Sequence, residues 1–273
     1  MRHSISPAIH AAAFEALGVD ARYEVRRTAA ADLESAMREL ARGGPRRPGG
    51  GNVTVPHKEA AAASLDEPAD AVRRSGACNC FWGLPGGELA GDNTDVAAFV
   101  DAVEALPGIR LSGARLLLLG AGGGARAVLL ASLERGVETI DILNRNPKRA
   151  AAAAAHVVGD RLPVRVLEQA PTSGGYDLVV NATTLGLGPA DPLPIDLDPL
   201  DVGAAFDLVY GERGTRWTNH AEARGVAAAD GLDMLIRQAG YSIRRWLDLE
   251  PPLGVMRLAA DRALSNPRGH PDS

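Results

Sequence analysis

The sequence predicts an α/β protein with two domains that face each other across a cleft. After Leu106-Pro107-Gly108, apolar runs typical of buried parallel strands alternate with helical stretches, and a separate, shorter series of helices and strands precedes this point. A chain of 273 residues is long enough for two ordinary domains. We therefore place an N-terminal α/β domain at residues 1–95 and a second domain at 96–230, and we expect the helices of 231–273 to return to the first domain.

The composition excludes several classes of protein. Hydrophobic residues make up 46% and charged residues 23% of the chain, as in ordinary soluble globular proteins. The net charge of −5 argues against a nucleic-acid partner, which would require a basic surface. No apolar run approaches the ~20 residues of a membrane helix, and the N-terminus has no export signal. We expect a cytoplasmic monomer or homodimer that binds small molecules and has no membrane partner.

The two cysteines, Cys78 and Cys80, predict no metal site. They are one residue apart, a spacing at which disulfides rarely form, and two thiols are too few to hold a structural metal. We expect two small, half-buried residues in a reducing compartment.

A helix is predicted at the N-terminus. Ser6 followed by Pro7 is typical of a helix start, with serine at the N-cap and proline at N1, and Gly18 ends the helix. Capping accounts for Ser6, whereas Ser4 has no such role and is the better candidate for contacting a ligand. The expected apolar face consists of Ile9, Ala13, Phe14 and Leu17. A short strand over 23–26 and a helix over 31–42 follow.

The stretch Gly50-Gly51-Asn52-Val53-Thr54-Val55-Pro56-His57-Lys58 reads as a strand that stops at a proline. Val53 and Val55 would be buried on one face, with Asn52 and Thr54 on the other. Lys58 then follows the end of a strand, where open α/β sheets bind their ligands. From this stretch alone, a solvent-exposed lysine after a turn is the simpler interpretation.

Further elements complete the first domain. After Lys58 we expect an alanine-rich helix, a helical turn over 70–75, a strand over 76–82 and a hairpin at Pro85-Gly86-Gly87. Asn79 would lie on the face opposite the cysteines. Asp95 opens a helix over 96–106, so it is either a functional acid or an acid favoured by the helix dipole.

A glycine-rich turn marks the second domain as Rossmann-like. The apolar run 114–119 predicts a buried strand, residues 120–125 read Gly-Ala-Gly-Gly-Gly-Ala, a helix runs to about Arg135, and a second strand covers 139–143. In such a βαβ unit, the backbone N–H groups of the turn and the helix N-terminus hold a pyrophosphate. The sequence therefore predicts a dinucleotide site.

The end of the second strand indicates which dinucleotide binds. An NAD site usually has an acid there for the ribose 2′-hydroxyl. This chain has Asn144-Arg145-Asn146-Pro147-Lys148-Arg149 instead. Guanidinium groups bind phosphate in a bidentate fork, so the 2′-phosphate of NADP fits better. A merely solvated basic loop would not account for the missing acid.

The alternation of strands and helices continues to the C-terminus. Strands are expected over 164–167, 177–181, 205–209 and 225–228, with Tyr210 after the third and a loop at 182–186 beside the cofactor. On a helix starting near Gly231, residues 231, 234 and 238 share one face, so Gln238 either faces the cleft or is an ordinary exposed glutamine. We expect the polar tail beyond Asn266 to be frayed.

An ordered series of motifs resembles the shikimate dehydrogenase family over nearly the whole chain. The motifs are Ser4-Ile5-Ser6-Pro7, Asn52-Val53-Thr54-Val55-Pro56-His57-Lys58, Gly76-Ala77-Cys78-Asn79, Gly91-Asp92-Asn93-Thr94-Asp95, Gly120-Ala121-Gly122-Gly123, Asn144-Arg145, Asn181-Ala182-Thr183 and Asp230-Gly231-Leu232-Asp233-Met234-Leu235. The resemblance implies NADP-dependent, reversible reduction of 3-dehydroshikimate to shikimate, in the pathway to chorismate and aromatic amino acids.

The resemblance also implies roles for individual residues. Lys58 and Asp95 would be the catalytic pair. Substrate would be bound by Ser4, Ser6, Thr54, Lys58, Asn79, Asp95, Tyr210 and Gln238. The cofactor would be bound by Gly120, Ala121, Gly122, Gly123, Gly124, Ala125, Asn144, Arg145, Arg149, Thr183 and Gly231. Hydride delivery to a ketone builds negative charge on its oxygen, which an ammonium group stabilises and protonates, so no metal is needed.

The chain departs from the family pattern in three places. The family has a strand before the serine motif, whereas this chain begins three residues ahead of Ser4; we expect the true start to lie upstream and the missing strand to expose neighbouring sheet edges. Cys80 and Asn146 replace threonines. The alternatives are a quinate or aminoshikimate dehydrogenase, a non-catalytic shikimate-binding relative, and an unrelated NADP enzyme of similar fold.

Overall fold

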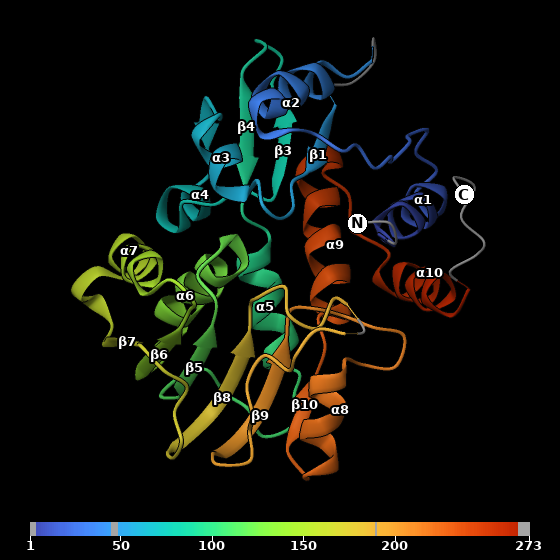
Figure 1. Cartoon of the computed structure of the whole chain (residues 1–273). Helices are drawn as coiled ribbons and strands as arrows, with labels where there is room; N and C mark the ends of the chain where they lie inside the picture. The colour runs from blue at the N-terminus through green and yellow to red at the C-terminus, as the bar shows by residue number, and fades with distance from the viewer. Residues whose placement is uncertain (1–3, 45–48, 189, 267–273) are drawn as a thin grey trace.

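The computed structural model describes residues 4–44, 49–188 and 190–266. It has the predicted α/β architecture, with two separate sheets (Figure 1). A four-stranded sheet has the order β1-β3-β4-β2, and a six-stranded sheet has the order β10-β9-β8-β5-β6-β7. Within the described ranges, no helix combines the length and apolar character needed to cross a bilayer.

The first part of the chain forms the small mixed sheet and its helices. β1 and β4 pair antiparallel with β3 on its two sides, and β2 pairs parallel with β4, so the predicted hairpin between β3 and β4 is confirmed. The elements are α1 Ser6–Ala16, η1 Ala30–Asp32, α2 Leu33–Arg42, β1 Gly50–Asn52, α3 Lys58–Ala63, β2 Glu67–Pro68, α4 Asp70–Ser75, β3 Cys80–Gly83 and β4 Leu89–Asp92.

The predicted N-terminal helix is present, but Ser6 does not cap it. The N-cap is Ile5, whose backbone is already helical at φ −87° and ψ −1°, and no side chain caps the helix. Ser6 therefore lies inside the helix, and its backbone N–H donates to Ser4 Oγ at 3.4 Å. The expected apolar face is confirmed for Ile9, Ala13 and Phe14, which are all buried.

One strand prediction in this part of the chain was wrong, and another placed the end of its strand too late. Residues 23–26 form no strand, and Val25 is 45% exposed. Among the described residues, β1 pairs only with β3, so no neighbouring strand offers residues 23–26 a hydrogen-bonding ladder. The strand predicted between Gly50 and Pro56 is present as β1 but already ends at Asn52, because the chain turns at residues 54–57, where His57 N–H donates to the Thr54 carbonyl. Val53 is consequently buried, whereas Val55 is 53% exposed.

The two cysteines are fully buried rather than half-buried. Both are free thiols with 0% exposure, and Cys78 Sγ contacts the Cys80 carbonyl oxygen at 3.2 Å. Burial raises the pKa of both thiols, which keeps them protonated. They therefore act as small apolar side chains in the small sheet.

The second part of the chain forms an entirely parallel sheet, as the alternating pattern predicts. All five strand pairings are parallel. The elements are α5 Asp95–Val103, β5 Arg115–Leu119, α6 Gly123–Arg135, β6 Thr139–Leu143, α7 Pro147–Val157, η2 Gly159–Arg161, β7 Val164–Leu167, β8 Gly175–Asn181, β9 Asp201–Asp207, α8 Arg216–Ala223 and β10 Ala227–Ala229.

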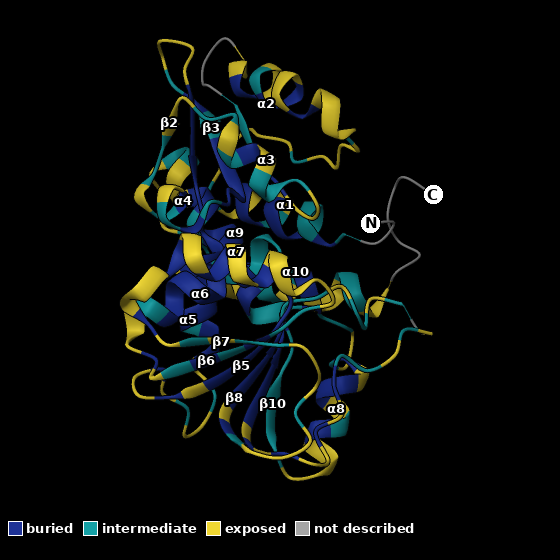
Figure 2. Ribbon diagram, turned by 60° about the vertical axis from the view of Figure 1, so that its left-hand side comes forward, coloured by how far each residue is buried: buried dark blue, intermediate teal, exposed yellow. Residues whose placement is uncertain are grey.

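Both faces of the parallel sheet are covered, so its central strands are buried (Figure 2). In β5, Leu116 and Leu118 pack with α5, α6 and α7, whereas Leu117 and Leu119 face the α8 side. The strand order reverses between β5 and β8. Doubly wound sheets bind ligands at such a switch point, beyond the carboxyl ends of the strands.

The last two helices contact the first part of the chain. α10 Leu253–Ser265 packs on α1, beside it in Figure 1, and α9 Leu232–Leu247 packs on both α1 and α5. Trp246 Nε1 donates to the Phe81 carbonyl, and Arg245 pairs with Asp92 of β4. These contacts support our proposal that the C-terminal helices belong with the N-terminal domain; the tail predicted to fray lies outside the described residues.

Candidate active site between the two sheets

A buried ion pair joins the first residues of two helices. Lys58 begins α3 and Asp95 begins α5, and Lys58 Nζ lies 2.5 Å from Asp95 Oδ2. Their side chains are only 14% and 7% exposed. Such a pair is stable only when the remaining lone pairs are also satisfied, and Asn79 Nδ2 donates to Asp95 Oδ1 at 2.9 Å. The lysine is thereby held in one place.

Asn79 connects this ion pair to α9. Its Nδ2 lies within hydrogen-bonding distance of Asp95 Oδ1, Thr94 Oγ1 and Gln238 Oε1, the last at 3.3 Å. An amide nitrogen carries two hydrogens, so it cannot satisfy three acceptors at once. The longest contact is the one to Gln238. Gln238, which is 8% exposed, can therefore give up this contact to a ligand at little cost.

Tyr210 lies beside the N-terminal serine motif. It packs in the apolar cluster that contains Ile5, between Ser4 and Ser6 in the chain. Burial raises the pKa of Tyr210, while a hydrogen bond with the Ile5 backbone lowers it. Tyr210 is thus a neutral phenol at Ile5, whose two neighbours in the chain, Ser4 and Ser6, are partly exposed. Thr54 is exposed, and within the described chain no hydrogen bond joins its side chain to this group.

The glycine-rich turn lies at the switch point of the parallel sheet. Gly120 has φ +109°, and a Cβ there would meet the Ala182 carbonyl oxygen at 2.8 Å, so only glycine fits. Gly122 is the N-cap of α6; no side chain caps this helix, and the space a Gly122 Cβ would occupy is open. An uncapped helix start behind an open glycine turn fits a pyrophosphate.

Gly123 brings this turn into contact with Lys58. A Cβ on Gly123 would lie 2.7 Å from Lys58 Cβ and 2.9 Å from its Cδ. The stem of the lysine therefore lies directly over the start of α6. The predicted catalytic residue and the predicted pyrophosphate turn are neighbours in space.

The residues predicted for the adenosine phosphate lie at the start of α7. Asn144 Nδ2 donates to the Asn146 carbonyl, and Asn146 Oδ1 caps the helix by accepting from Arg149 N–H. Asn146, where the resemblance implied a threonine, thus caps α7. Arg145 is exposed, whereas Arg149 forms an ion pair with Glu59 of α3.

Thr183 and Gly231 have structural roles at the strand ends. Thr183 Oγ1 donates to Asn181 Oδ1 at 2.7 Å, which holds the turn after β8. A Cβ on Gly231 would meet the Leu208 carbonyl oxygen at 2.4 Å, so α9 begins directly against the end of β9.

Sequence reasoning missed three polar residues of this site. Thr94 is 4% exposed and bonds to both Asn79 and the Gln238 carbonyl. Asn52 Nδ2 donates to Ser242 Oγ and to the Asn79 carbonyl. Glu59 bridges to α7. Thr94 could have been identified by its place before Asp95 in the motif, whereas Glu59 resembles any charged residue on a helix.

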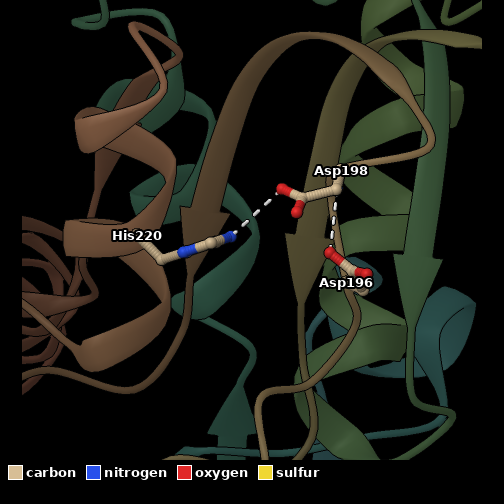
Figure 3. A group of neighbouring side chains, drawn as sticks. All are labelled: Asp196, Asp198 and His220. Carbon is tan, nitrogen blue, oxygen red and sulfur yellow. Dashed lines mark hydrogen bonds and ion pairs between the residues drawn. The ribbon is translucent and has the colours of Figure 1, made fainter.

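A second group of possible metal ligands lies elsewhere, at the loop before β9 and on α8. Asp196, Asp198 and His220 point toward one another there (Figure 3). Asp196 Oδ1 already accepts from Asp198 N–H, and Asp198 Oδ1 pairs with Arg224 at 3.1 Å. The two aspartates are exposed. Asp198 and Arg224 therefore join the loop to the end of α8 as an ion pair.

Comparison with known proteins identifies relatives along the whole chain. Residues 1–81 match the profile of the shikimate dehydrogenase substrate binding domain. A protein named shikimate dehydrogenase (NADP(+)) from Brucella abortus (strain S19) is 40% identical, over 92% of this chain and 87% of its own. One of the same name from Thermus thermophilus is also 40% identical, over 96% and 95%.

Solved structures share the architecture. Shikimate 5-dehydrogenase from Thermus thermophilus, in complex with NADP(H) and shikimate, superposes with a TM-score of 0.81 at 38% identity, covering 96% of this chain and 95% of its own. A ligand-free 5-ketofructose reductase of Gluconobacter sp. strain CHM43 gives 0.79 at 28% identity, covering 94% and 93%. The identity and coverage of these relatives show that the chain belongs to the shikimate dehydrogenase family.

Proposed function

We propose that the chain is an NADP-dependent oxidoreductase that interconverts 3-dehydroshikimate and shikimate. Family membership and the names of relatives covering more than nine-tenths of the chain support this activity. The observation that carries the proposal is the position of Lys58, which is paired with Asp95 and lies over Gly123 of the glycine turn. An ammonium group next to a dinucleotide site suits carbonyl reduction.

Lys58 and Asp95 are the proposed catalytic pair. Bound NADPH supplies the hydride, and Lys58 Nζ stabilises the charge on the ketone oxygen and donates a proton to it. Asp95 Oδ2 keeps Nζ in position, and Asn79 holds Asp95 through its other oxygen. In the reverse direction, Lys58 Nζ accepts the proton of the hydroxyl.

The polar residues around the Lys58–Asp95 pair and the serine motif are the proposed substrate site. Tyr210 lies beside the serine motif, and the side-chain amide of Gln238 contacts Asn79. Both supply neutral hydrogen-bond donors and acceptors suited to hydroxyl groups. An exposed Thr54 near the strand end offers one more hydroxyl. The proposed set is Ser4, Ser6, Thr54, Lys58, Asn79, Asp95, Tyr210 and Gln238.

The proposed cofactor site follows the carboxyl ends of β5, β6 and β8. The open, uncapped turn of residues 120–125 would hold the pyrophosphate. Asn144, Arg145 and Arg149 would bind the adenosine phosphate, for which guanidinium groups are suited. Thr183 and Gly231 would border the nicotinamide. We also propose a cytoplasmic location, in keeping with two free thiols, and a monomer or homodimer.

Steady-state kinetics on three substrates test this function. Shikimate, quinate and an amino analogue of shikimate are each assayed with NADP and with NAD, following the absorbance of the reduced cofactor. We expect the highest kcat/KM with shikimate and NADP. A higher value with quinate or the amino analogue would reassign the substrate, and shikimate binding without hydride transfer would indicate a non-catalytic relative.

A further inference from the structure

Glu59 connects the catalytic segment to the basic cluster of the cofactor site. It follows Lys58 on α3, and its carboxylate lies between two arginines from the other part of the chain. Arg149 Nη2 of α7 donates to Glu59 Oε1 at 2.5 Å, and Arg126 Nη2 of α6 lies 3.5 Å from Glu59 Oε2. One carboxylate thus contacts both α6 and α7.

The two arginines differ in how firmly they are held. The Arg126 side chain is 12% exposed and also donates through Nη1 to the Ser75 carbonyl of α4. The Arg149 side chain is 54% exposed, and its one ion pair in the described chain is the contact with Glu59. Arg126 can therefore remain on Glu59 and neutralise it when Arg149 leaves.

Arg149 differs from its basic neighbours because it is paired with an acid. Arg145 and Lys148 are exposed and, in the part of the chain that the structure describes, form no ion pair with an acid. Arg149 is therefore the cation of this cluster whose charge is already compensated. A phosphate approaching the cluster must take Arg149 from Glu59 or share it with a second anion.

We propose that Glu59 competes with the 2′-phosphate of the cofactor for Arg149, and thereby sets the affinity for NADP relative to NAD. This inference rests on the proposed NADP-dependent function. A carboxylate beside the phosphate repels it, and the Glu59–Arg149 contact must break or be shared before the phosphate gains the guanidinium. NAD has no phosphate at this position, so its binding does not depend on this competition. Glu59 is thus a positioning residue that acts through Arg149.

The expected effect is modest, because both partners are partly solvated. An exposed ion pair such as Glu59–Arg149 contributes little free energy, so little is needed to break it. Removing the negative charge of Glu59 near the phosphate favours cofactor binding by a comparable amount. Together they predict that Glu59→Gln binds NADPH about three- to tenfold more tightly, with little change for NADH. Gln keeps the size of the side chain and removes its charge.

Fluorescence titration of the full chain with NADPH and with NADH tests this proposal. Glu134→Gln is the matched control: Glu134 of α6 pairs with Arg74 of α4 at 2.5 Å, and these side chains are 39% and 33% exposed. We expect tighter NADPH binding in Glu59→Gln alone. In an Arg149→Ala background the same substitution should give a smaller gain, because only the direct repulsion of the phosphate by Glu59 is then removed.

Each other outcome is decisive. Unchanged or weaker NADPH binding in Glu59→Gln, or an equal gain for NADH, would overturn the competition. A gain of undiminished size in the Arg149→Ala background would also overturn it. If the parent chain shows no preference for NADPH over NADH, the proposed cofactor is wrong and the inference fails with it; a clear parental preference with no response to Glu59→Gln refutes the inference alone.

Discussion

Gly123 is the point at which the glycine turn meets Lys58, so a single methyl group there tests how closely the two sites depend on each other. In Gly123→Ala, the added Cβ would lie 2.7 Å from Lys58 Cβ, 2.9 Å from Cδ and 3.2 Å from Cγ. Carbon atoms pack at about 3.5–4.0 Å. The lysine stem, or α3 as a whole, must therefore move by about 1 Å.

The displacement affects catalysis more than folding. Lys58 Nζ is held 2.5 Å from Asp95, so a stem moved by this amount either breaks the pair or shifts the ammonium group. A misplacement of about 1 Å costs roughly a hundredfold in rate. Gly123 begins α6, where alanine favours the helix by up to about 1 kcal/mol over glycine. This gain offsets part of the cost of displacing the buried pair, so we expect a large loss of kcat with a comparatively small fall in Tm.

Initial rates with shikimate and NADP, together with thermal unfolding, measure both effects. Gly254→Ala is the control, because a Cβ at this position in α10 would meet no atom within 4 Å. It should leave rate and Tm nearly unchanged. A Gly123→Ala variant with parental kcat and parental Tm would refute the reasoning, since it would mean that the position of Lys58 does not limit turnover.

Two buried titratable groups predict opposite pH dependences of stability. Burial lowers the pKa of His10 to about 4, below its ordinary value of 6.5, so the stability that depends on neutral His10 is lost as pH falls from 6.5 toward 4. His10→Phe retains an aromatic ring to stack on Tyr23. It should abolish this pH-dependent loss, which amounts to roughly 3 kcal/mol in the free energy of unfolding measured with urea. Burial raises the pKa of Asp207 from 3.8 to about 6. The stability that depends on protonated Asp207 is therefore fully present below pH 3.8 and is lost as pH rises through 6. Asp207→Asn should remove that opposite slope, also roughly 3 kcal/mol; a variant with the parental pH profile would contradict either assignment.

Local sequence was sufficient to predict the parallel sheet. The run Leu116-Leu117-Leu118-Leu119 is apolar at every position because each face of β5 contributes to a different core cluster. The glycine turn was predictable for a similar reason, since Gly120 needs a positive φ and close contact with Ala182. In both cases the local structure, a buried strand or a tight turn, determines which residues can occupy it.

The errors arose where distant residues, or in one case a local turn, decide the structure. Residues 23–26 have strand character but no neighbouring strand among the described residues, and Val55 is exposed because the chain turns at residues 54–57. The Lys58–Asp95 pair joins residues 37 positions apart, so local patterns could suggest each residue but not their contact. Glu59 was missed because its partners lie 67 and 90 residues further along the chain.

The central claim is that Lys58 carries the chemistry, and turnover of Lys58→Ala tests it most directly. The measurement is the rate of NADPH formation from shikimate and NADP, with circular dichroism and NADPH titration on the same sample to establish folding and cofactor binding. We predict a loss of about a thousandfold or more in kcat in a folded variant that still binds NADPH. Turnover within about tenfold of the parent, a smaller loss than proton transfer by a positioned side chain is expected to cause, would contradict the account.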